Sequence, residues 1–298
     1  MIAPDWIAAD WGTTNLRVWA MKGGSVLDTA SSDAGMAALS PEQFETALLA
    51  LIDPWLHCPT DVIACGMVGA RQGWVEASYT AVPCTPVLRD MARAPTTDPR
   101  LNVHVIGGLK QDKPADVMRG EETQIAGFLA LNDGWDGVIC LPGTHTKWAH
   151  ISAGEVVSFQ TFMTGEQFNL LSGSSVLRHS VDTNGWDDAA LDSGVSDALS
   201  RPERLAGYLF NLRASDLLHN LPKDTAHARM SGLLIGAELA AARPFWLGQN
   251  IAIVGADKLA NVYGKALNAQ GALATIASAD RMTLAGLQAA HRHLKETV

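Results

Sequence analysis

The stretch Asp10-Trp11-Gly12-Thr13-Thr14-Asn15-Leu16-Arg17 decides the fold, because one apolar run ends in it and another begins in it. The residues Trp6 to Asp10 and Leu16 to Met21 are typical of two strands joined by a short turn. Gly12 lets a backbone approach an anion, the successive amides and two hydroxyls supply donors, and Asp10 can hold the hydration shell of a metal ion. The stretch predicts a phosphate-binding hairpin, with a plain hairpin turn as the alternative.

The same layout returns at an offset of about 131 residues. Each copy has an apolar strand, a Gly-Thr turn, a second strand, a glycine turn and a third strand. The gap-free matches pair Gly12, Thr13, Gly23 and Val26 with Gly143, Thr144, Gly154 and Val157. Hairpins with glycine turns are common enough to match by chance, but the constant offset favours duplication. The repeat predicts two similar domains facing each other.

The second copy carries its own donor-rich turn, Gly143-Thr144-His145-Thr146-Lys147. Two such hairpins can hold one polyphosphate from both sides. His145 can donate to a phosphate or serve only the turn. The phosphate-binding candidates are Gly12, Thr13, Thr14, Asn15, Arg17, Gly143, Thr144, His145, Thr146 and Lys147.

Composition excludes several classes of protein. The chain has 298 residues, of which 47% are hydrophobic and 18% are charged, so it can form large cores. The net charge of -9 disfavours a nucleic-acid partner, and an anionic ligand must be held by local donors. Glu238, Arg243 and Pro244 interrupt the most apolar stretch, which excludes a membrane span. Four cysteines without metal-ligand spacing, and no signal peptide in front, predict free thiols in the cytoplasm.

Strand-like and helical patterns alternate along the chain, which is typical of an α/β protein. Helices are expected at 41–52, 121–131, 164–171, 187–199, 202–210, 214–219, 225–242, 256–268 and 281–294, and later strands at 61–65, 102–106, 137–141, 250–254 and 273–277. The glycine-rich segment 107–114 is the best candidate for a domain boundary.

These motifs resemble those of the superfamily that contains actin, the heat-shock chaperone ATPases and the sugar kinases. A closer resemblance is to the 2-dehydro-3-deoxygalactonokinase family. The residues that carry it are Asp10 to Arg17, Gly66 to Trp74, Asp116 to Gln124, Leu141 to Trp148, Phe162 to Glu166 and Gly232 to Leu239. In many superfamily members the second hairpin begins with an acidic residue, whereas this chain has Leu141-Pro142, so a second metal-facing carboxylate must come from elsewhere or be absent.

The resemblance implies two actin-like (ribonuclease H-like) domains with mixed sheets and an active site in the interdomain cleft. It also implies ATP and Mg²⁺ as cofactors and 2-dehydro-3-deoxy-D-galactonate as the phosphate acceptor in galactonate catabolism. Residues 1–113 would bind the sugar acid and phosphate, and residues 114–298 would bind ATP and carry the base, with the last helix free to pack back on the first domain. A related sugar or sugar acid, a sugar sensor and a filament-forming ATPase are the alternatives. The sequence is compatible with a homodimer but does not fix the oligomeric state.

Phosphorylating a hydroxyl needs a carboxylate that orients it and accepts its proton late in the reaction. Glu121 is the first choice, because it opens a helix and follows a glycine, as the base does in glycerol-kinase-like enzymes. Asp116 and Glu122 are the other catalytic candidates, beside Asp10 as the metal-facing residue. A cluster of helix-capping acids is the alternative for all three.

An acceptor with a carboxylate, a ketone and hydroxyls needs a guanidinium and amide-type groups. The substrate-binding candidates are Met67, Arg71, Gln72, Trp74, Thr164 and Glu166. Arg71 would pair with the carboxylate and Trp74 would stack on the sugar. The alternative is that Arg71 is only a surface arginine and Trp74 only a core tryptophan. For the nucleotide base, Gly255-Ala256 forms a strand-to-helix turn that resembles the adenosine motif of the superfamily.

Overall fold

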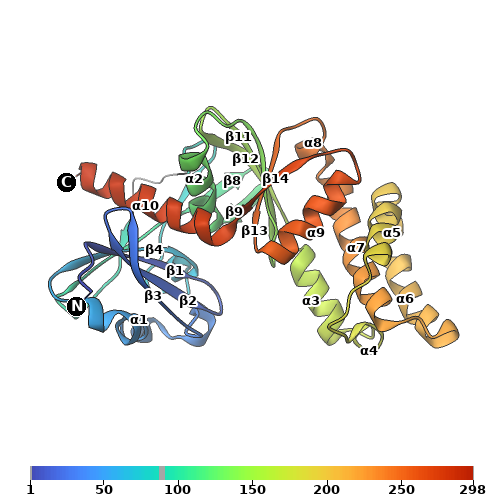
Figure 1. The fold of residues 1–298 in the computed structure, drawn as a ribbon, viewed down its shortest axis with the longest axis horizontal. Helices are drawn as coiled ribbons and strands as arrows, with labels where there is room; N and C mark the ends of the chain where they lie inside the picture. Colours follow the sequence, from blue (N-terminus) through green and yellow to red (C-terminus); the bar gives the residue numbers. More distant parts are fainter. Residues whose placement is uncertain (1, 87–90, 298) are drawn as a thin grey trace. The chain divides into compact units, whose positions relative to one another are not determined.

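The computed structural model describes residues 2–86 and 91–297. The chain is an α/β protein that divides into two compact units (Figure 1). Unit 1 comprises residues 1–136, 151–158 and 278–298, and unit 2 comprises residues 137–150 and 159–277. Within the described residues, no helix is both long and apolar enough to cross a membrane.

The main sheet of unit 1 has the strand order β3-β2-β1-β4-β7-β6. Its strands are β1 (Trp6–Trp11), β2 (Leu16–Lys22), β3 (Ser25–Ser32), β4 (Thr60–Gly66), β6 (Ala92–Arg93) and β7 (Leu101–Val105). β1 pairs antiparallel with β2 and parallel with β4, so the ends of β1 and β4 meet at one edge of the sheet. This arrangement confirms the predicted meander and places Asp10 at that edge.

Helix α1 (Phe44–Ile52) covers the aromatic core of unit 1. It follows a short turn at Pro41–Gln43, where Ser40 and Gln43 form a capping box. Further short 3-10 turns lie at Met36–Ala38, Asp53–Trp55 and Met67–Gly69. The buried faces of α1 and β1 pack together, and this packing fixes the position of the hairpin after β1.

The expected boundary at 107–114 is wrong, because this segment is part of a sheet in unit 1. That sheet has the order β5-β8-β9, with β5 (Tyr79–Ala81), β8 (Gly108–Asp112) and β9 (Ala115–Met118). The next helix, α2 (Glu121–Leu131), lies beside α10 (Ala279–Thr297), as Figure 1 shows. The first change of unit therefore falls between Asp136 and Gly137, not at residue 113. The last helix belongs to unit 1.

The five-stranded sheet, most of whose residues belong to unit 2, has the order β12-β11-β10-β13-β14, and its first four strands repeat the β3-β2-β1-β4 order of the first sheet. Its strands are β10 (Gly137–Leu141), β11 (Thr146–Ser152), β12 (Glu155–Phe162), β13 (Ile251–Gly255) and β14 (Ala274–Ser278). β10 pairs parallel with β13, as β1 pairs with β4. The duplicated topology confirms the internal repeat that the sequence predicts.

A set of helices between β12 and β13 distinguishes unit 2 from unit 1. They are α3 (Thr164–Ser174), α4 (Arg178–Val181), α5 (Asp188–Ser200), α6 (Leu205–His219), α7 (Lys223–Ala241) and α8 (Arg243–Trp246), with a 3-10 turn at Pro202–Arg204, and α9 (Asp257–Asn268) follows β13. Helices α5, α6 and α7 lie side by side (yellow to orange in Figure 1). The two helices expected at 202–210 and 214–219 are one helix, because the backbone stays helical until Asn220, whose φ is 52°.

Candidate functional site

The hairpin between β1 and β2 is held by backbone hydrogen bonds, and its polar side chains are exposed. The Gly12 amide donates to the Asn15 carbonyl at 2.9 Å, and the Met36 amide donates to the Gly12 carbonyl at 3.0 Å. Thr13, Thr14 and Asn15 are all exposed. A hollow of about 470 Å³ is lined by Asp10, Gly12, Thr14, Asn15, Arg17, Ser31, Ser32 and Asp33. The structure thus places most of the first set of phosphate-binding candidates around one hollow.

Asp10 lies at the edge of this hollow between two partners. Its Oδ2 accepts a hydrogen bond from Arg17 Nη2 at 2.6 Å, and its Oδ1 accepts from Cys65 Sγ at 3.7 Å. Arg17 also pairs with Asp280 of α10. Burial, with the nearby Asp10 and Glu122 carboxyls, raises the pKa of the Cys65 thiol well above its usual value, so the thiol remains a donor. All four cysteines are free thiols, as expected.

The start of helix α2 lies against the end of β4. Gly66 has a φ of 90° and Gly120 a φ of 104°, a region that glycine adopts readily. A Cβ on Gly120 would lie 3.4 Å from the Gly66 Cα, and one on Gly66 would lie 2.7 Å from the Trp11 carbonyl oxygen. These close approaches bring the first turn of α2, with Glu121, near the strand end that carries Asp10.

The three carboxylates proposed as the base have different surroundings. Glu122 is 0% exposed, and it accepts hydrogen bonds from the Gly120 amide at 2.7 Å and the Thr123 hydroxyl at 3.0 Å. Burial and the neighbouring Glu121 raise the pKa of Glu122 to about 8. A sealed carboxyl cannot contact an acceptor sugar, so Glu122 is a structural residue and the prediction of a catalytic role for it is wrong.

Glu121 and Asp116 are both partly exposed. Glu121 Oε2 accepts a hydrogen bond from the Arg119 amide at 3.1 Å, in the first turn of α2. Asp116 lies on β9 opposite Gln111, toward the turn of the β8-β9 hairpin. Of these two carboxylates, Glu121 is therefore the one that lies in the first turn of α2.

The loop after β4 divides the substrate candidates. The Arg71 side chain is 80% exposed and forms an ion pair with Glu76 at 3.4 Å, and Gln72 is also exposed. Trp74 is only 7% exposed; it packs against Trp11 and Phe44, and its Nε1 donates to the Pro95 carbonyl. The expectation that Trp74 stacks on a sugar is wrong, because its ring belongs to the core.

Arg119 ties the start of α2 to the same loop, although sequence reasoning gave it no role. Its Nη2 donates to the Ala77 carbonyl at 2.7 Å, and its guanidinium lies 4.3 Å from the centre of the Tyr79 ring. A Cβ on Gly69 would meet Arg119 Nη1 at 2.8 Å. This side chain therefore holds the Met67–Gly69 turn, where Met67 is partly exposed, next to the residues that precede Glu121.

In unit 2, the Gly143-Thr144 hairpin is packed against the start of α3. The Glu166 amide donates to the Thr144 carbonyl at 2.8 Å, and the Glu166 carboxylate lies 2.6 Å from His145 Nε2. Thr164 and Glu166 are thus neighbours of the Gly143-Thr144 hairpin. Gly143 is partly exposed and Thr144 and His145 are exposed, so the tip of the turn is open to a ligand.

Two further residues of this hairpin face inward. Thr146 is fully buried, and its hydroxyl lies 3.0 Å from the Tyr263 hydroxyl. Lys147 is also buried, and its Nζ donates to the His145 carbonyl at 3.2 Å. The prediction that the Thr146 and Lys147 side chains bind phosphate is wrong, because the two residues lie on opposite faces of β11 and both faces are buried at its start.

A buried carboxylate, Glu238 of α7, joins the elements around this hairpin. It accepts hydrogen bonds from Trp148 Nε1 and the Tyr263 hydroxyl, each at 2.8 Å, and from the Thr164 hydroxyl. Burial raises the pKa of Glu238, and it raises that of Tyr263 well above the usual value, so the tyrosine hydroxyl keeps its proton. The network fixes Thr164 and Tyr263, which both line a cavity.

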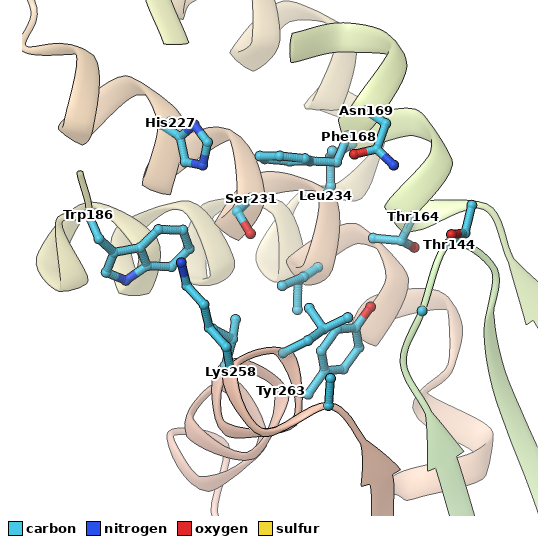
Figure 2. A pocket seen from close by; sticks show the side chains of 16 residues that line it. Thr144, Thr164, Phe168, Asn169, Trp186, His227, Ser231, Leu234, Lys258 and Tyr263 are labelled. Carbon is cyan, nitrogen blue, oxygen red and sulfur yellow. The ribbon is translucent and has the colours of Figure 1, made fainter. Parts of the chain in front are cut away.

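That cavity has a volume of about 410 Å³ and lies wholly within unit 2. Its lining residues are Gly143, Thr144, Thr164, Gly165, Phe168, Asn169, Trp186, His227, Ser231, Leu234, Ile235, Ala256, Lys258, Leu259, Val262 and Tyr263. Figure 2 shows Thr144 and Thr164 at one end, and Trp186, His227 and Lys258 toward the other. Ala256 of the predicted adenosine motif therefore lies in the cavity wall, and a Cβ on Gly255 would come within 3.1 Å of the Pro142 ring.

Comparison with known proteins identifies the family of the chain. The 2-keto-3-deoxy-galactonokinase family matches residues 10–290. The chain belongs to this family. It is 37% identical over 297 residues to a protein of Rhizobium meliloti (strain 1021) assigned as a 2-dehydro-3-deoxygalactonokinase, with 96% of each chain covered. It is also 34% identical over 287 residues to the 2-dehydro-3-deoxygalactonokinase of Escherichia coli (strain K12), with 95% of this chain and 96% of that protein covered.

Solved structures agree with the family assignment. A crystal structure from Sinorhizobium meliloti assigned to the same activity has a TM-score of 0.90 at 35% identity, covering 97% of this chain and 99% of that one. The activator of 2-hydroxyisocaproyl-CoA dehydratase from Clostridium difficile, solved with bound ADPNP, has a TM-score of 0.53 at 11% identity, covering 98% and 96%. The second likeness concerns the fold alone, which is the actin-like ATPase fold.

For this member of the 2-keto-3-deoxy-galactonokinase family, sequence reasoning missed most of the cavity wall. Phe168, Asn169 and Trp186 carry no motif that distinguishes them from core or surface residues. His227, Ser231 and Leu234 follow the spacing of one helix face, so their shared direction could have been predicted, but not what they face.

Proposed function

We propose that the protein transfers the γ-phosphate of ATP to the terminal hydroxyl of 2-dehydro-3-deoxy-D-galactonate. The product is 2-dehydro-3-deoxy-6-phospho-D-galactonate, and the reaction belongs to galactonate catabolism in the cytoplasm. The observation that carries the proposal is the cavity of unit 2, which has the exposed Gly143-Thr144 turn of the internal repeat in its wall. Membership of the 2-keto-3-deoxy-galactonokinase family supports the choice of acceptor.

Unit 2 would bind the nucleotide. The cavity volume of about 410 Å³ and its apolar and aromatic wall suit a purine nucleoside. The amides of Gly143 and Thr144 and the hydroxyl of Thr144 would donate to the phosphates. The buried Glu238 network holds Thr164 in place before the ligand arrives, so little ordering is needed on binding.

Unit 1 would bind and activate the acceptor. Glu121 orients the terminal hydroxyl and accepts its proton late, as a loose phosphoryl-transfer transition state requires. The exposed guanidinium of Arg71 pairs with the sugar-acid carboxylate, and Gln72 offers amide hydrogen bonds to its hydroxyls.

Unit 1 also has a donor set that fits Mg²⁺. Mg²⁺ in kinases is held by one or two carboxylates, by phosphates and by water. Asp10 supplies one carboxylate beside a polar hollow, and its contact with Arg17 favours a water-mediated role. Within residues 2–86 and 91–297, no group of three His, Cys, Asp or Glu side chains is suited to hold a metal by itself. When bound, the ion would neutralise charge on the phosphates.

The proposal is tested by incubating the protein with Mg²⁺, ATP and a panel of acids. The panel contains 2-dehydro-3-deoxy-D-galactonate, its gluconate-type epimer and D-galactonate, and ADP release is measured. The galactonate derivative should have the highest kcat/KM. A higher kcat/KM for another acid would identify that acid as the substrate. Binding of an acid without ADP release would favour a sugar sensor. Sedimentation that needs ATP but no sugar would favour a filament.

The base is tested with Glu121→Gln, for which kcat should fall by about 10² to 10⁴ while both KM values change little. Glu296→Gln, on the exposed side of α10, is the matched control and should keep wild-type activity. If Glu121→Gln retains full turnover, Asp116 becomes the remaining candidate.

A further inference from the structure

One face of helix α7 lines the unit 2 cavity, and its first contributor is a histidine. His227, Ser231 and Leu234 share this face, with His227 at the end of the cavity away from Thr144 and Thr164 (Figure 2). The following inference rests on the proposed function. If the phosphates lie at the Gly143-Thr144 turn, the base of the nucleotide lies toward His227.

The surroundings of His227 determine which of its ring nitrogens can accept a hydrogen bond. Nδ1 lies 3.0 Å from the Val181 carbonyl oxygen. A carbonyl oxygen can only accept, so Nδ1 carries the hydrogen. In the neutral ring, Nε2 is then an acceptor. Over the part of the chain that the structure describes, Nε2 has no protein donor, and the half-buried ring lines the cavity.

Two aromatic neighbours keep the imidazole in this orientation. The Phe168 ring lies 5.1 Å from it at an interplanar angle of 78°, and the Trp186 ring lies 5.9 Å away at 72°. Both neighbours also line the cavity. Rotating the ring by half a turn would break the bond to Val181 and disturb both edge contacts, so the position of the acceptor is fixed before a nucleotide binds.

We propose that His227 selects the nucleotide base, with its Nε2 accepting a hydrogen bond from the 6-amino group of adenine. Guanine and hypoxanthine have a carbonyl oxygen at position 6, and two acceptors facing each other cannot form that bond. Exchanging the imidazole hydrogen to Nε2 would leave the Val181 carbonyl without its donor. An unpaired polar group in a binding site lowers affinity by about 10-fold or more.

Lys258 lies at the same end of the cavity but does not make this distinction. Its Nζ lies 5.9 Å from the centre of the Trp186 ring and offers only hydrogen-bond donors. N7 is an acceptor in every purine, so a lysine directed to it would bind adenine and hypoxanthine alike. The discrimination therefore depends on the acceptor of His227.

The experiment compares ADP and IDP, which differ at position 6 of the base. Binding of each to the full chain is measured by titration calorimetry without any sugar acid. The wild type should bind ADP about 10-fold or more tightly than IDP. In His227→Asn, the amide nitrogen can take the place of Nδ1 and keep the Val181 bond, but no atom replaces Nε2. Its preference should fall to about threefold or less.

Two more variants complete the test. His227→Gln places an amide with both a donor and an acceptor near the Nε2 position, so IDP should bind more tightly than to the wild type. His219→Asn changes an exposed histidine of α6 outside the cavity and should keep the wild-type preference. Circular dichroism and thermal unfolding confirm that each variant is folded.

The outcomes separate the inference from the proposed function. Equal binding of ADP and IDP by the wild type, or an unchanged preference in His227→Asn, overturns the role of His227 and leaves the kinase proposal intact. The protein could instead fail to phosphorylate any acid in the panel, while the wild type prefers ADP and His227→Asn loses that preference. This result overturns the proposed acceptor and supports the role of His227. Absence of binding for both nucleotides overturns the inference together with the nucleotide site.

Discussion

Trp148 Nε1 donates a hydrogen bond of 2.8 Å to Glu238 Oε1, joining strand β11 to helix α7 inside unit 2. Trp148 is 0% exposed and Glu238 is 3% exposed, so water cannot replace either partner. The same carboxylate binds the hydroxyls of Thr164 and Tyr263, which reach the cavity wall. The core of unit 2 and the candidate nucleotide site therefore share one buried acceptor.

Replacing Glu238 by Ala should destabilise the protein and weaken nucleotide binding together. The change leaves the Trp148 indole and two hydroxyls without their acceptor, which should cost about 3 kcal/mol in the free energy of unfolding. Glu238→Gln keeps the size and one carbonyl oxygen for Trp148, and both hydroxyls can accept from its amide nitrogen. Urea unfolding should show a much smaller loss for Glu238→Gln, and equal losses would contradict the network.

Glu122 should make the protein less stable as the pH rises. Its pKa is about 8 in the folded protein against 4.5 for the free side chain, so the folded state holds its proton more tightly than the unfolded chain. The resulting stabilisation is complete below about pH 4.5 and is lost as the pH rises toward 8. Between pH 6 and pH 8, the urea midpoint of the wild type should fall.

Glu122→Gln is the matched variant for this effect. Its amide oxygen can accept from the Gly120 amide and its nitrogen can donate to Thr123, so the two local bonds persist without a titrating group. The midpoint of the variant should fall less over the same pH range. A wild-type slope that survives the substitution would mean that another group, such as Glu238, dominates it.

Arg71 should act on the sugar acid and not on ATP. Its exposed guanidinium offers two parallel donors to a carboxylate, and only the acceptor carries one. Arg71→Ala should raise KM for the sugar acid by about 10-fold or more while KM for ATP changes less than about twofold. Arg93→Ala, another exposed arginine of unit 1, is the control. Equal increases in both KM values would contradict the assignment of Arg71 to the sugar-acid carboxylate. Arg119 would then be the next arginine to test.

The sequence predicts this fold well where the pattern is local and repeated. The Gly-Thr turns and flanking strands locate both meanders, and α2 begins and ends at the expected residues. It fails where burial decides a role. Trp74 and Glu122 carry functional residue types but lie in the core, and Thr146 is buried at the start of β11 whereas Thr144 is exposed in the turn before it. The cavity wall comes from helices inserted between β12 and β13, so its residues converge only after folding.

Gly165 should be required for the phosphate turn of unit 2. A Cβ at this position would lie 2.2 Å from the Gly143 carbonyl oxygen, so alanine would displace the Gly143-Thr144 backbone from the start of α3. Gly165→Ala should raise KM for ATP by about 10-fold or more while KM for the sugar acid stays within about twofold. Gly173 lies on the same helix with open space at its Cβ position, so Gly173→Ala changes helix propensity without this collision. Steady-state kinetics with each substrate varied in turn measures both. If Gly165→Ala and Gly173→Ala behave alike, the packing of α3 on the turn does not control nucleotide binding.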